Sequence, residues 1–142
     1  MVTSRKNTIR AISAALMLML CFSLFATAAS AEEGSPYIGH YMASMGASNN
    51  GVVSITFQIT GTGMMDQIGA TRITIYENNV AVQTLVHTST PGMMVNNHFI
   101  HANSYTYNGV IGRTYWARVT FQAGKGGDCD NRSLNSNSVV AR

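Results

Sequence analysis

Charged residues are scarce in this sequence. They make up 11% of the chain, whereas ordinary soluble domains contain roughly 25%. No run of like charges occurs anywhere along it. Because proteins that bind nucleic acids depend on clustered Lys and Arg, nothing in the sequence indicates a nucleic-acid partner.

Groups that carry catalytic chemistry are equally sparse. The chain has no Gly-x-Ser-x-Gly nucleophile elbow. Its acidic residues beyond residue 33 are Asp66, Glu77, Asp128 and Asp130, and a glycosidase needs two carboxyl groups that face each other. We therefore expect no catalytic residues and no enzymatic activity. A hydrolase is kept as a third hypothesis, which a screen of ester, glycoside and peptide substrates would test.

Cysteine is nearly absent. Cys21 lies in the N-terminal segment, and the large Leu20 before it does not fit a lipoprotein site. Only Cys129 remains for the exported chain, which excludes an intramolecular disulfide. Two interpretations of Cys129 stay open, an inert loop thiol and an intermolecular disulfide formed in an oxidising medium.

Metal-binding patterns are also missing. Of the four histidines, His98 and His101 are three residues apart and would point to opposite faces of a strand, while zinc needs three or four converging ligands. Asp128–Asn131 resembles a calcium-binding sequence only in its alternating oxygens, and it lacks the glycine and late glutamate of a full calcium loop. We expect surface histidines, a polar loop at 128–131, no metal and no cofactor.

An export signal is present. Three basic residues precede the apolar run Ala11–Ala28, and Ala29-Ser30-Ala31 is a small-x-small cleavage site. The apolar run is barely long enough to span a membrane, and no basic residues follow it. The sequence therefore predicts a signal peptide at residues 1–31, cleavage at Ala31-Glu32, and one secreted, extracellular domain at residues 32–142.

Cleavage changes the electrostatic character of the chain. Three of the nine basic residues lie in the leader, which leaves six basic and six acidic residues in the mature protein. The formal charge of +3 therefore belongs to the precursor. A secreted toxin or antimicrobial acting on membranes is the alternative hypothesis, and the neutral mature chain without a basic amphipathic helix argues against it. We expect no membrane insertion of the mature chain.

The mature sequence alternates apolar and polar residues, which is typical of half-buried strands. Gly61–Gly63 reads as a turn, Met64–Ile68 as a short helical turn, and Asn78-Asn79 as a two-residue hairpin turn. About seven strands with short connections and one apolar face each predict an all-β fold, a single antiparallel two-sheet β-sandwich. The expected strands are Tyr37–Met45, Val53–Thr60, Thr71–Tyr76, Val80–Val86, His98–Tyr107, Tyr115–Ala123 and Ser133–Ala141.

Two methionine pairs, Met64-Met65 and Met93-Met94, fall in expected loops. We expect one methionine of each pair to plug an end of the sandwich. The alternative is an adaptable apolar contact surface, since methionine repacks easily.

The segment Gly112–Tyr115 resembles the corner before the sixth strand of fibronectin type III and related immunoglobulin-like sandwiches. This resemblance implies that the Tyr115 hydroxyl bonds back to the backbone of the corner. The chain departs from the pattern because it lacks an inward tryptophan on the second strand, where Phe57 stands instead. Gly63–Ala70 and Thr120–Gly127 are similar to segments of small secreted proteins of unknown function from Gram-positive gut bacteria, which implies export and carries no activity.

One surface is a candidate for binding. In a fibronectin-like plan the third and sixth strands are neighbours, and their outward residues combine Trp, Tyr and Arg, the residue types of binding hot spots. The predicted binding residues are Arg72, Tyr76, Trp116 and Arg118, and the partner is an unknown extracellular protein or glycan. The alternative is a covered surface in which Arg stacks over Trp. The first hypothesis is therefore a secreted, non-catalytic binding or adhesion module.

Overall fold

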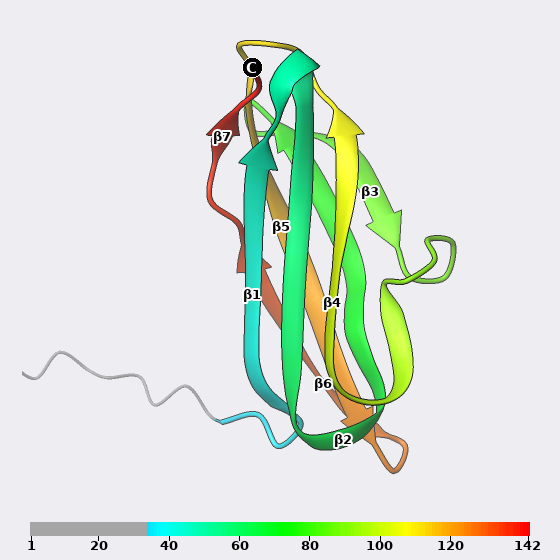
Figure 1. Ribbon diagram of the computed structural model, residues 1–142. Coiled ribbons are helices and arrows are strands. Elements are labelled where there is room, and N and C mark those ends of the chain that lie inside the picture. The colour runs from blue at the N-terminus through cyan, green and yellow to red at the C-terminus, as the bar shows by residue number, and fades with distance from the viewer. Residues whose placement is uncertain (1–33) are drawn as a thin grey trace, which may run out of the picture. The chain divides into compact units, whose positions relative to one another are not determined.

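The computed structural model describes residues 34–142, so the predicted signal peptide lies outside the described residues. Every strand pair is antiparallel, and the prediction of an all-β domain is confirmed. Within residues 34–142, no helix is long and apolar enough to cross a bilayer. The strands are β1 (Ile38–Ala47), β2 (Val52–Glu77), β3 (Val80–Val86), β4 (Met94–Asn108), β5 (Thr114–Lys125), β6 (Asp128–Asn135) and β7 (Val139–Val140), and a 3₁₀ turn, η1 (Asn49–Gly51), joins β1 to β2 (Figure 1).

β2 organises the whole domain. It is a single strand of 26 residues, where the sequence predicts two strands separated by a turn at Gly61–Gly63 and a helical turn at Met64–Ile68. Both of these expected turns are wrong, because Met65 and Ile68 pair with β4 as strand residues and are buried. The pairing register shifts between Thr60 and Met65. Such irregularities bend a strand without ending it.

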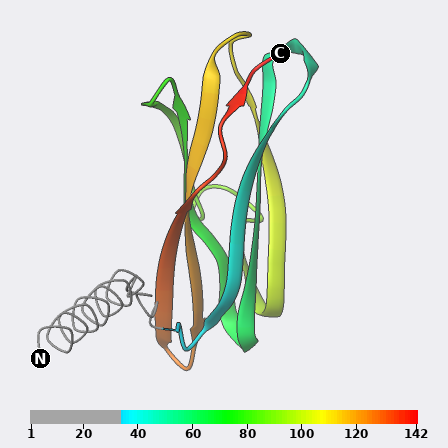
Figure 2. The same cartoon turned by 90° about the vertical axis from the view of Figure 1, so that its left-hand side faces the viewer.

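Because β2 bends, a single sheet folds over and supplies both layers around the core. The first half of β2 pairs with β1 and β4, and its second half pairs with β5 on one side and with β4 and β3 on the other. Figure 1 shows β2 and β4 curving over together at the lower end of the domain. The sequence predicts two separate sheets, whereas hydrogen bonds through β2 place all seven strands in one antiparallel sheet that curls into a half-barrel. Its two halves face each other in Figure 2.

The core fills the space inside the curl. Alternate side chains of β2 and β5 point inward and are almost completely buried, as their sequence alternation predicts. Phe57 and Phe121 lie on opposite halves, and their ring centroids are 6.2 Å apart. Each fully buried side chain of this size contributes about 1.5–3 kcal/mol to folding. The largest buried side chains are Tyr115, Phe57, Phe121, Ile55, Ile59, Ile68, Ile73, Ile75, Met93, Val53 and Val119.

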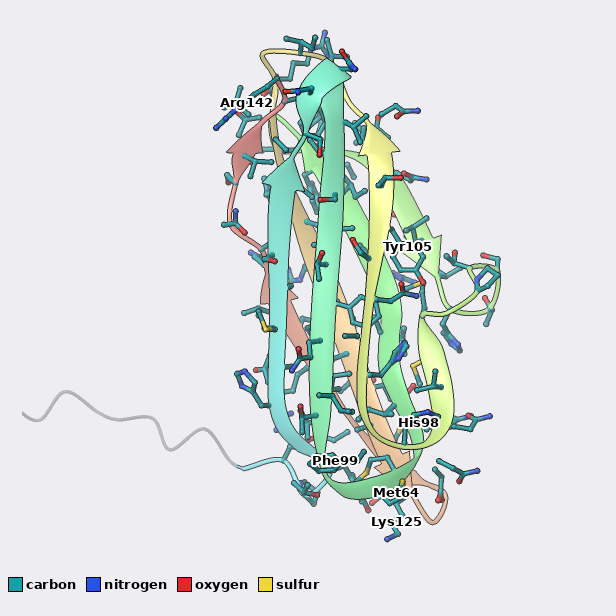
Figure 3. The ribbon with its side chains drawn as sticks, in the orientation of Figure 1. Met64, His98, Phe99, Tyr105, Lys125 and Arg142 are labelled. Carbon is teal, nitrogen blue, oxygen red and sulfur yellow. The ribbon has the colours of Figure 1, made fainter. Side chains whose placement is uncertain are left out.

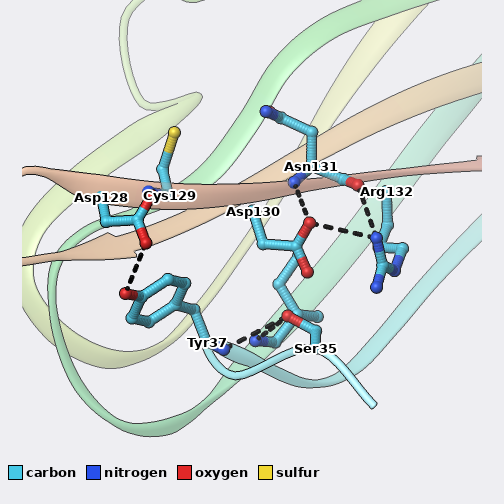
Figure 4. A network of polar contacts seen from close by, with 8 residues as sticks. Ser35, Tyr37, Asp128, Cys129, Asp130, Asn131 and Arg132 are labelled. Atoms are coloured by element: carbon cyan, nitrogen blue, oxygen red, sulfur yellow. Dashed lines mark hydrogen bonds and ion pairs between the residues drawn. The ribbon is translucent and has the colours of Figure 1, made fainter. Parts of the chain in front are cut away.

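Polar side chains connect β1 and the residues just before it to β6 and the residues just after it. We call this line of contacts the seam. The Asn137 amide accepts a hydrogen bond from the Met45 N–H and donates one to the Met45 carbonyl, each 2.9 Å long. The Tyr37 hydroxyl donates to Asp128 at 3.0 Å (Figure 4). The sequence predicts a polar loop at Asp128–Asn131, but this prediction is wrong because these residues form the first half of β6.

The connection between β3 and β4 covers the opposite side. The Tyr105 hydroxyl donates to the Pro91 carbonyl at 2.8 Å. His101 Nε2 and Asn103 Nδ2 donate to the Gly92 carbonyl at 2.7 and 3.0 Å. Met93 is buried beneath this connection. The backbone carbonyls of the loop are therefore satisfied by side chains of β4.

The hairpin turn between β2 and β3 has the geometry that its residues favour. Asn78 and Asn79 adopt φ values of 47° and 68° between the paired Glu77 and Val80, which confirms the predicted two-residue turn. Left-handed backbone at both central positions produces the twist that β-hairpins require.

The corner before β5 contains the tyrosine bond that the fibronectin resemblance implies. The Tyr115 hydroxyl accepts a hydrogen bond from the Val110 N–H at 2.8 Å and donates one to the Glu77 carboxylate. Arg113 forms an ion pair with the same carboxylate. Gly112 turns the chain with a φ of 86°. The corner is thereby fixed to the end of β2.

Candidate functional site

The outer surface of β2 and β5 is the candidate site. Register pairs Arg72 with Thr120, Thr74 with Arg118, and Tyr76 with Trp116. The two strands are therefore direct neighbours, as expected, and the four predicted binding residues lie on one surface. We call the surface formed by these six residues the β2–β5 face.

The aromatic end of the β2–β5 face is a stacked pair. The rings of Tyr76 and Trp116 lie with centroids 4.1 Å apart and an interplanar angle of 5°. The Trp116 indole N–H donates to Asn79 Oδ1 at 2.9 Å. Trp116 therefore stacks on Tyr76, whereas the alternative interpretation placed an arginine over Trp116. Both aromatic side chains are half-buried and held in one orientation.

The two arginines of the face are exposed. Within residues 34–142, neither guanidinium of Arg72 or Arg118 takes part in an ion pair or a side-chain hydrogen bond. They occupy diagonal positions on adjacent strands, where Cα atoms lie about 7–8 Å apart. Neighbouring outward positions on β3 and β6 carry no charge; they are Val82, Thr84 and Val86, and Asn131, Ser133 and Asn135.

A hollow adjoins Arg72 where β3 leaves the sheet. Its volume is about 460 Å³. The His87 N–H donates to the Thr71 carbonyl at 3.1 Å, which holds the start of the loop beside the face. The residues that line it are Thr71, Arg72, Val86, His87, Thr88 and Thr120.

A second hollow lies further along β5, and the sequence analysis missed it. Its volume is about 470 Å³, and its lining combines four amide side chains with two carboxylates and one lysine. Gly124 is packed tightly at its base, because a Cβ added there would collide with the Asp128 carbonyl and the Cys129 side chain. No pattern in the sequence indicated a hollow here. The lining residues are Asp66, Gln67, Asn96, Asn97, Gln122, Gly124, Lys125, Gly127, Asp128 and Cys129.

Cys129 lies on β6 at the rim of this second hollow, not in the expected loop. Its thiol is free and exposed. Gln122 Nε2 donates to Cys129 Sγ at 3.0 Å. The proposed intermolecular disulfide stays a prediction.

Each acidic side chain between residues 34 and 142 is bonded to a donor of the protein. Asp66 accepts a hydrogen bond from the Gly126 N–H at 2.7 Å, and Asp128 accepts one from Tyr37. Asp130 pairs with Arg132 at 3.0 Å, and a hydrogen bond from the Ser35 hydroxyl is the main cause that lowers the pKa of Asp130. Hydrogen bonds from Tyr115 and then Arg113 lower the pKa of Glu77.

The two histidines of β4 lie in different environments. His101 packs edge-on against Phe57 with ring centroids 5.6 Å apart, whereas His98 is exposed and donates to the Asn96 carbonyl at 2.6 Å. Among the described residues, no three His, Cys, Asp or Glu side chains lie close enough together to hold a metal ion.

One methionine of each pair is buried, as expected. Met65 and Met93 belong to the core, and Met64 is 58% exposed. Figure 3 shows Met64 at the bent end of the domain with Phe99 and Lys125. Phe99 is 48% exposed. We call Met64, Phe99 and Lys125 the apolar tip.

Comparison of the chain with protein-family models, curated proteins and solved structures finds no match.

Proposed function

We propose that this chain is a secreted, non-catalytic binding module that captures an extracellular protein or glycan on its β2–β5 face. The stacked Tyr76–Trp116 pair, with Arg72 and Arg118 exposed beside it, is the observation that carries the proposal. Trp, Tyr and Arg are the residues most enriched among binding hot spots. Secretion, and cleavage after Ala31, belong to the same proposal and rest on the N-terminal sequence.

The scaffold suits recognition by a preformed surface. The aromatic rings stand on two hydrogen-bonded strands, and Asn79 fixes the Trp116 indole. A side chain that is already ordered loses little conformational entropy when a partner binds. The face therefore needs no rearrangement to present its aromatic and guanidinium groups.

The acidic residues support a non-catalytic role. Acid–base catalysis needs a carboxyl group that can reach a substrate, and each carboxylate from residue 34 onward already bonds to a protein donor. These contacts tie turns and strands together. We therefore assign the acidic residues to stability.

We also propose a fibronectin-like relationship in which the two halves of the curled sheet serve as the layers of a sandwich. The Tyr115 bond to the Val110 N–H supports it, because a tyrosine corner recurs in immunoglobulin-like folds. Phe57 fills the core where that pattern has a tryptophan.

The test is partner capture by substituted proteins. The chain is expressed from its full sequence, collected from the medium, immobilised, and exposed to mucus extracts and to surface material of neighbouring cells. We expect Tyr76→Ala and Trp116→Ala each to reduce capture about tenfold or more. Met42→Ala removes an exposed apolar side chain from β1 and serves as the matched control. Full capture by both aromatic variants would overturn the proposed face, and melting curves would show whether each variant is folded.

A second candidate function is membrane action, and the apolar tip favours it. Exposed Met64 and Phe99 beside Lys125 are residues that can enter a lipid interface. Release of dye from liposomes by the wild-type protein, abolished by Met64→Ser and Phe99→Ser together, would support this function. An absence of leakage would exclude it.

A further inference from the structure

Two unpaired cations stand side by side on the β2–β5 face. Arg72 and Arg118 are exposed diagonal neighbours, and no acidic side chain occupies an outward position between the Tyr76–Trp116 pair and Gln122. Like charges at neighbouring cross-strand positions repel each other. The free protein thus holds a concentration of positive charge on an otherwise neutral surface.

Arg72 and Arg118 form one diagonal of a square of four outward side chains, and two threonines form the other. Thr74 and Thr120 occupy the opposite diagonal. Thr74 Oγ1 lies 3.3 Å from Thr84 Oγ1, and Thr120 Oγ1 lies 3.1 Å from Ser133 Oγ. In each pair one hydroxyl can donate to the other while the second keeps its own proton for a ligand oxygen. The arginines are therefore surrounded by uncharged hydrogen-bonding groups.

The charge selects an anionic ligand. A planar guanidinium binds carboxylate or sulfate oxygens through two parallel N–H donors. The hollow of about 460 Å³ beside Arg72 provides room for part of such a ligand, with Thr88 and Thr120 in its lining, whereas the Thr71 hydroxyl already donates to the Thr120 carbonyl. An anion held between Arg72 and Arg118 would relieve the repulsion between the two guanidinium groups.

The remainder of the face fits a saccharide better than a peptide. Peptide anchors fill apolar pockets, whereas the second hollow is lined mostly by amide and charged side chains, and threonines lie beside the apolar surface of the hollow next to Arg72. Amide and hydroxyl side chains suit the many hydroxyls of a sugar, and aromatic rings present apolar surface to a sugar's C–H groups. The face thus combines an anion site with groups that recognise carbohydrate.

We infer that Arg72 and Arg118 form the anion subsite for an acidic glycan, a saccharide that carries sulfate or carboxylate groups. The inference rests on the proposed binding function and narrows its ligand to one chemical class. The aromatic pair lies at one end of this subsite, and the second hollow, whose lining includes the carboxylates of Asp66 and Asp128, lies at the other. An acidic saccharide of several units can therefore extend from the arginines towards the aromatic pair, whereas the two carboxylates disfavour its anionic groups at the other end.

Binding to defined polysaccharides tests the inference. The probes are chondroitin sulfate, hyaluronan, which carries carboxylates only, neutral dextran, and polyglutamate as an acidic peptide. We expect the wild-type protein to bind at least one of the two acidic polysaccharides, and the Arg72→Gln/Arg118→Gln double variant to bind it about tenfold more weakly or worse. Arg142→Gln makes the same change of net charge as either arginine substitution alone, at an exposed cation away from the face, and should change the affinity less than about twofold. A preference for chondroitin sulfate would identify sulfate as the recognised group, and equal binding of hyaluronan would identify carboxylate.

Several outcomes would overturn the inference. These are no binding to either acidic polysaccharide, equal binding to dextran, tighter binding to polyglutamate, or an equal loss with Arg142→Gln. The double variant replaces exposed side chains, and a circular-dichroism spectrum and melting curve matching the wild type verify its fold. If the partner captured from mucus or cell surfaces is lost with Trp116→Ala but retained by the arginine double variant, the proposed function stands and the acidic-glycan inference fails.

Discussion

At the scale of single residues, Tyr115 joins the corner before β5 to the end of β2. It is completely buried, it accepts a hydrogen bond from Val110, and it donates one to Glu77. Burial is the main cause that raises the pKa of the Tyr115 hydroxyl, and the bond to Glu77 adds to it. This hydroxyl therefore stays protonated and available as a donor.

Removing the Tyr115 hydroxyl should destabilise the domain. We expect Tyr115→Phe to lower the free energy of unfolding by about 1–3 kcal/mol, because it leaves the Val110 N–H without its partner. Urea denaturation measures the change. Tyr107→Phe, at a half-buried ring 5.8 Å from Tyr115, is the control and should cost less than about 0.5 kcal/mol. Equal losses in the two variants would contradict the role of the corner bond.

Glu77 should make the domain sensitive to acid. Its pKa is lowered in the folded state by Tyr115 and then Arg113, so the carboxylate adds stability at pH values above its unfolded pKa. This stability is lost as the pH falls through the lowered folded pKa. We expect Glu77→Gln to weaken the protein at neutral pH and to show a smaller further loss down to about pH 3. The same pH dependence in Glu77→Gln as in the wild type would show that Glu77 is not responsible.

Residue-scale features were predictable where one residue type imposes one geometry. Asn78-Asn79 indicated a tight hairpin because asparagine tolerates positive φ, and both residues adopt it. Tyr115 indicated a corner because glycine precedes it by three residues. The stacking of Trp116 on Tyr76 could not be predicted, because the sequence leaves the choice among Tyr and Arg partners to side-chain packing.

At the scale of elements, the bent β2 strand distinguishes this fold from the expected one. Gly69 lies where β2 passes from one half of the sheet to the other, and a Cβ added there would collide with the Met93 carbonyl. The Ala70 N–H donates to the same carbonyl at 2.8 Å. Close backbone approach at this point therefore requires glycine.

The glycines of β2 should tolerate substitution very differently. We expect Gly69→Ala to lower the free energy of unfolding by more than about 2 kcal/mol. Gly63→Ala, in the same strand with open space around the added methyl group, should change it by less than about 1 kcal/mol. Thermal melting of both variants tests this contrast. Similar melting temperatures would contradict the close approach of β2 and β4 at Gly69.

The arginine pair has a consequence for stability as well as for binding. Because Arg72 and Arg118 repel each other, Arg118→Gln should leave the free protein as stable as the wild type or more stable by up to about 0.5 kcal/mol. The difference should shrink as salt is added, since salt screens exposed charges. Denaturation at low and high salt measures it, and a clear destabilisation at low salt would show that Arg118 has a structural partner.

Element boundaries were less predictable than element identities. Gly61–Gly63 has the composition of a turn, yet β2 continues because β4 pairs on both sides of the bend and bends with it. Asp128–Asn131 is polar enough for a loop, yet it forms a strand because β5 supplies backbone partners and the seam supplies Tyr37 and Ser35. In both cases a distant segment overrides local preference.

At the scale of the whole molecule, the domain has few charges and one localised positive surface. From residue 32 onward the sequence has equal numbers of basic and acidic residues, and the acidic side chains from residue 34 onward bond within turns, the corner and the seam. The balanced total charge therefore gives no indication of the positive charge that Arg72 and Arg118 place on the β2–β5 face. The sequence indicated which four residues would gather there, but the two hollows beside them depend on how distant strands and loops come together and could not be predicted.

The central claim is that the partner binds on the β2–β5 face. Hydroxyl-radical footprinting tests this claim most directly, because each candidate surface carries side chains that hydroxyl radicals oxidise. The protein is labelled alone and with its captured partner, and oxidation is measured at Trp116 and Tyr76 on the face, at Met64 and Phe99 on the tip, and at Met42 on β1. The account predicts that the partner protects Trp116 and Tyr76 and leaves Met42, Met64 and Phe99 unchanged. Protection of Met64 and Phe99, with Trp116 and Tyr76 oxidised as in the free protein, would contradict it.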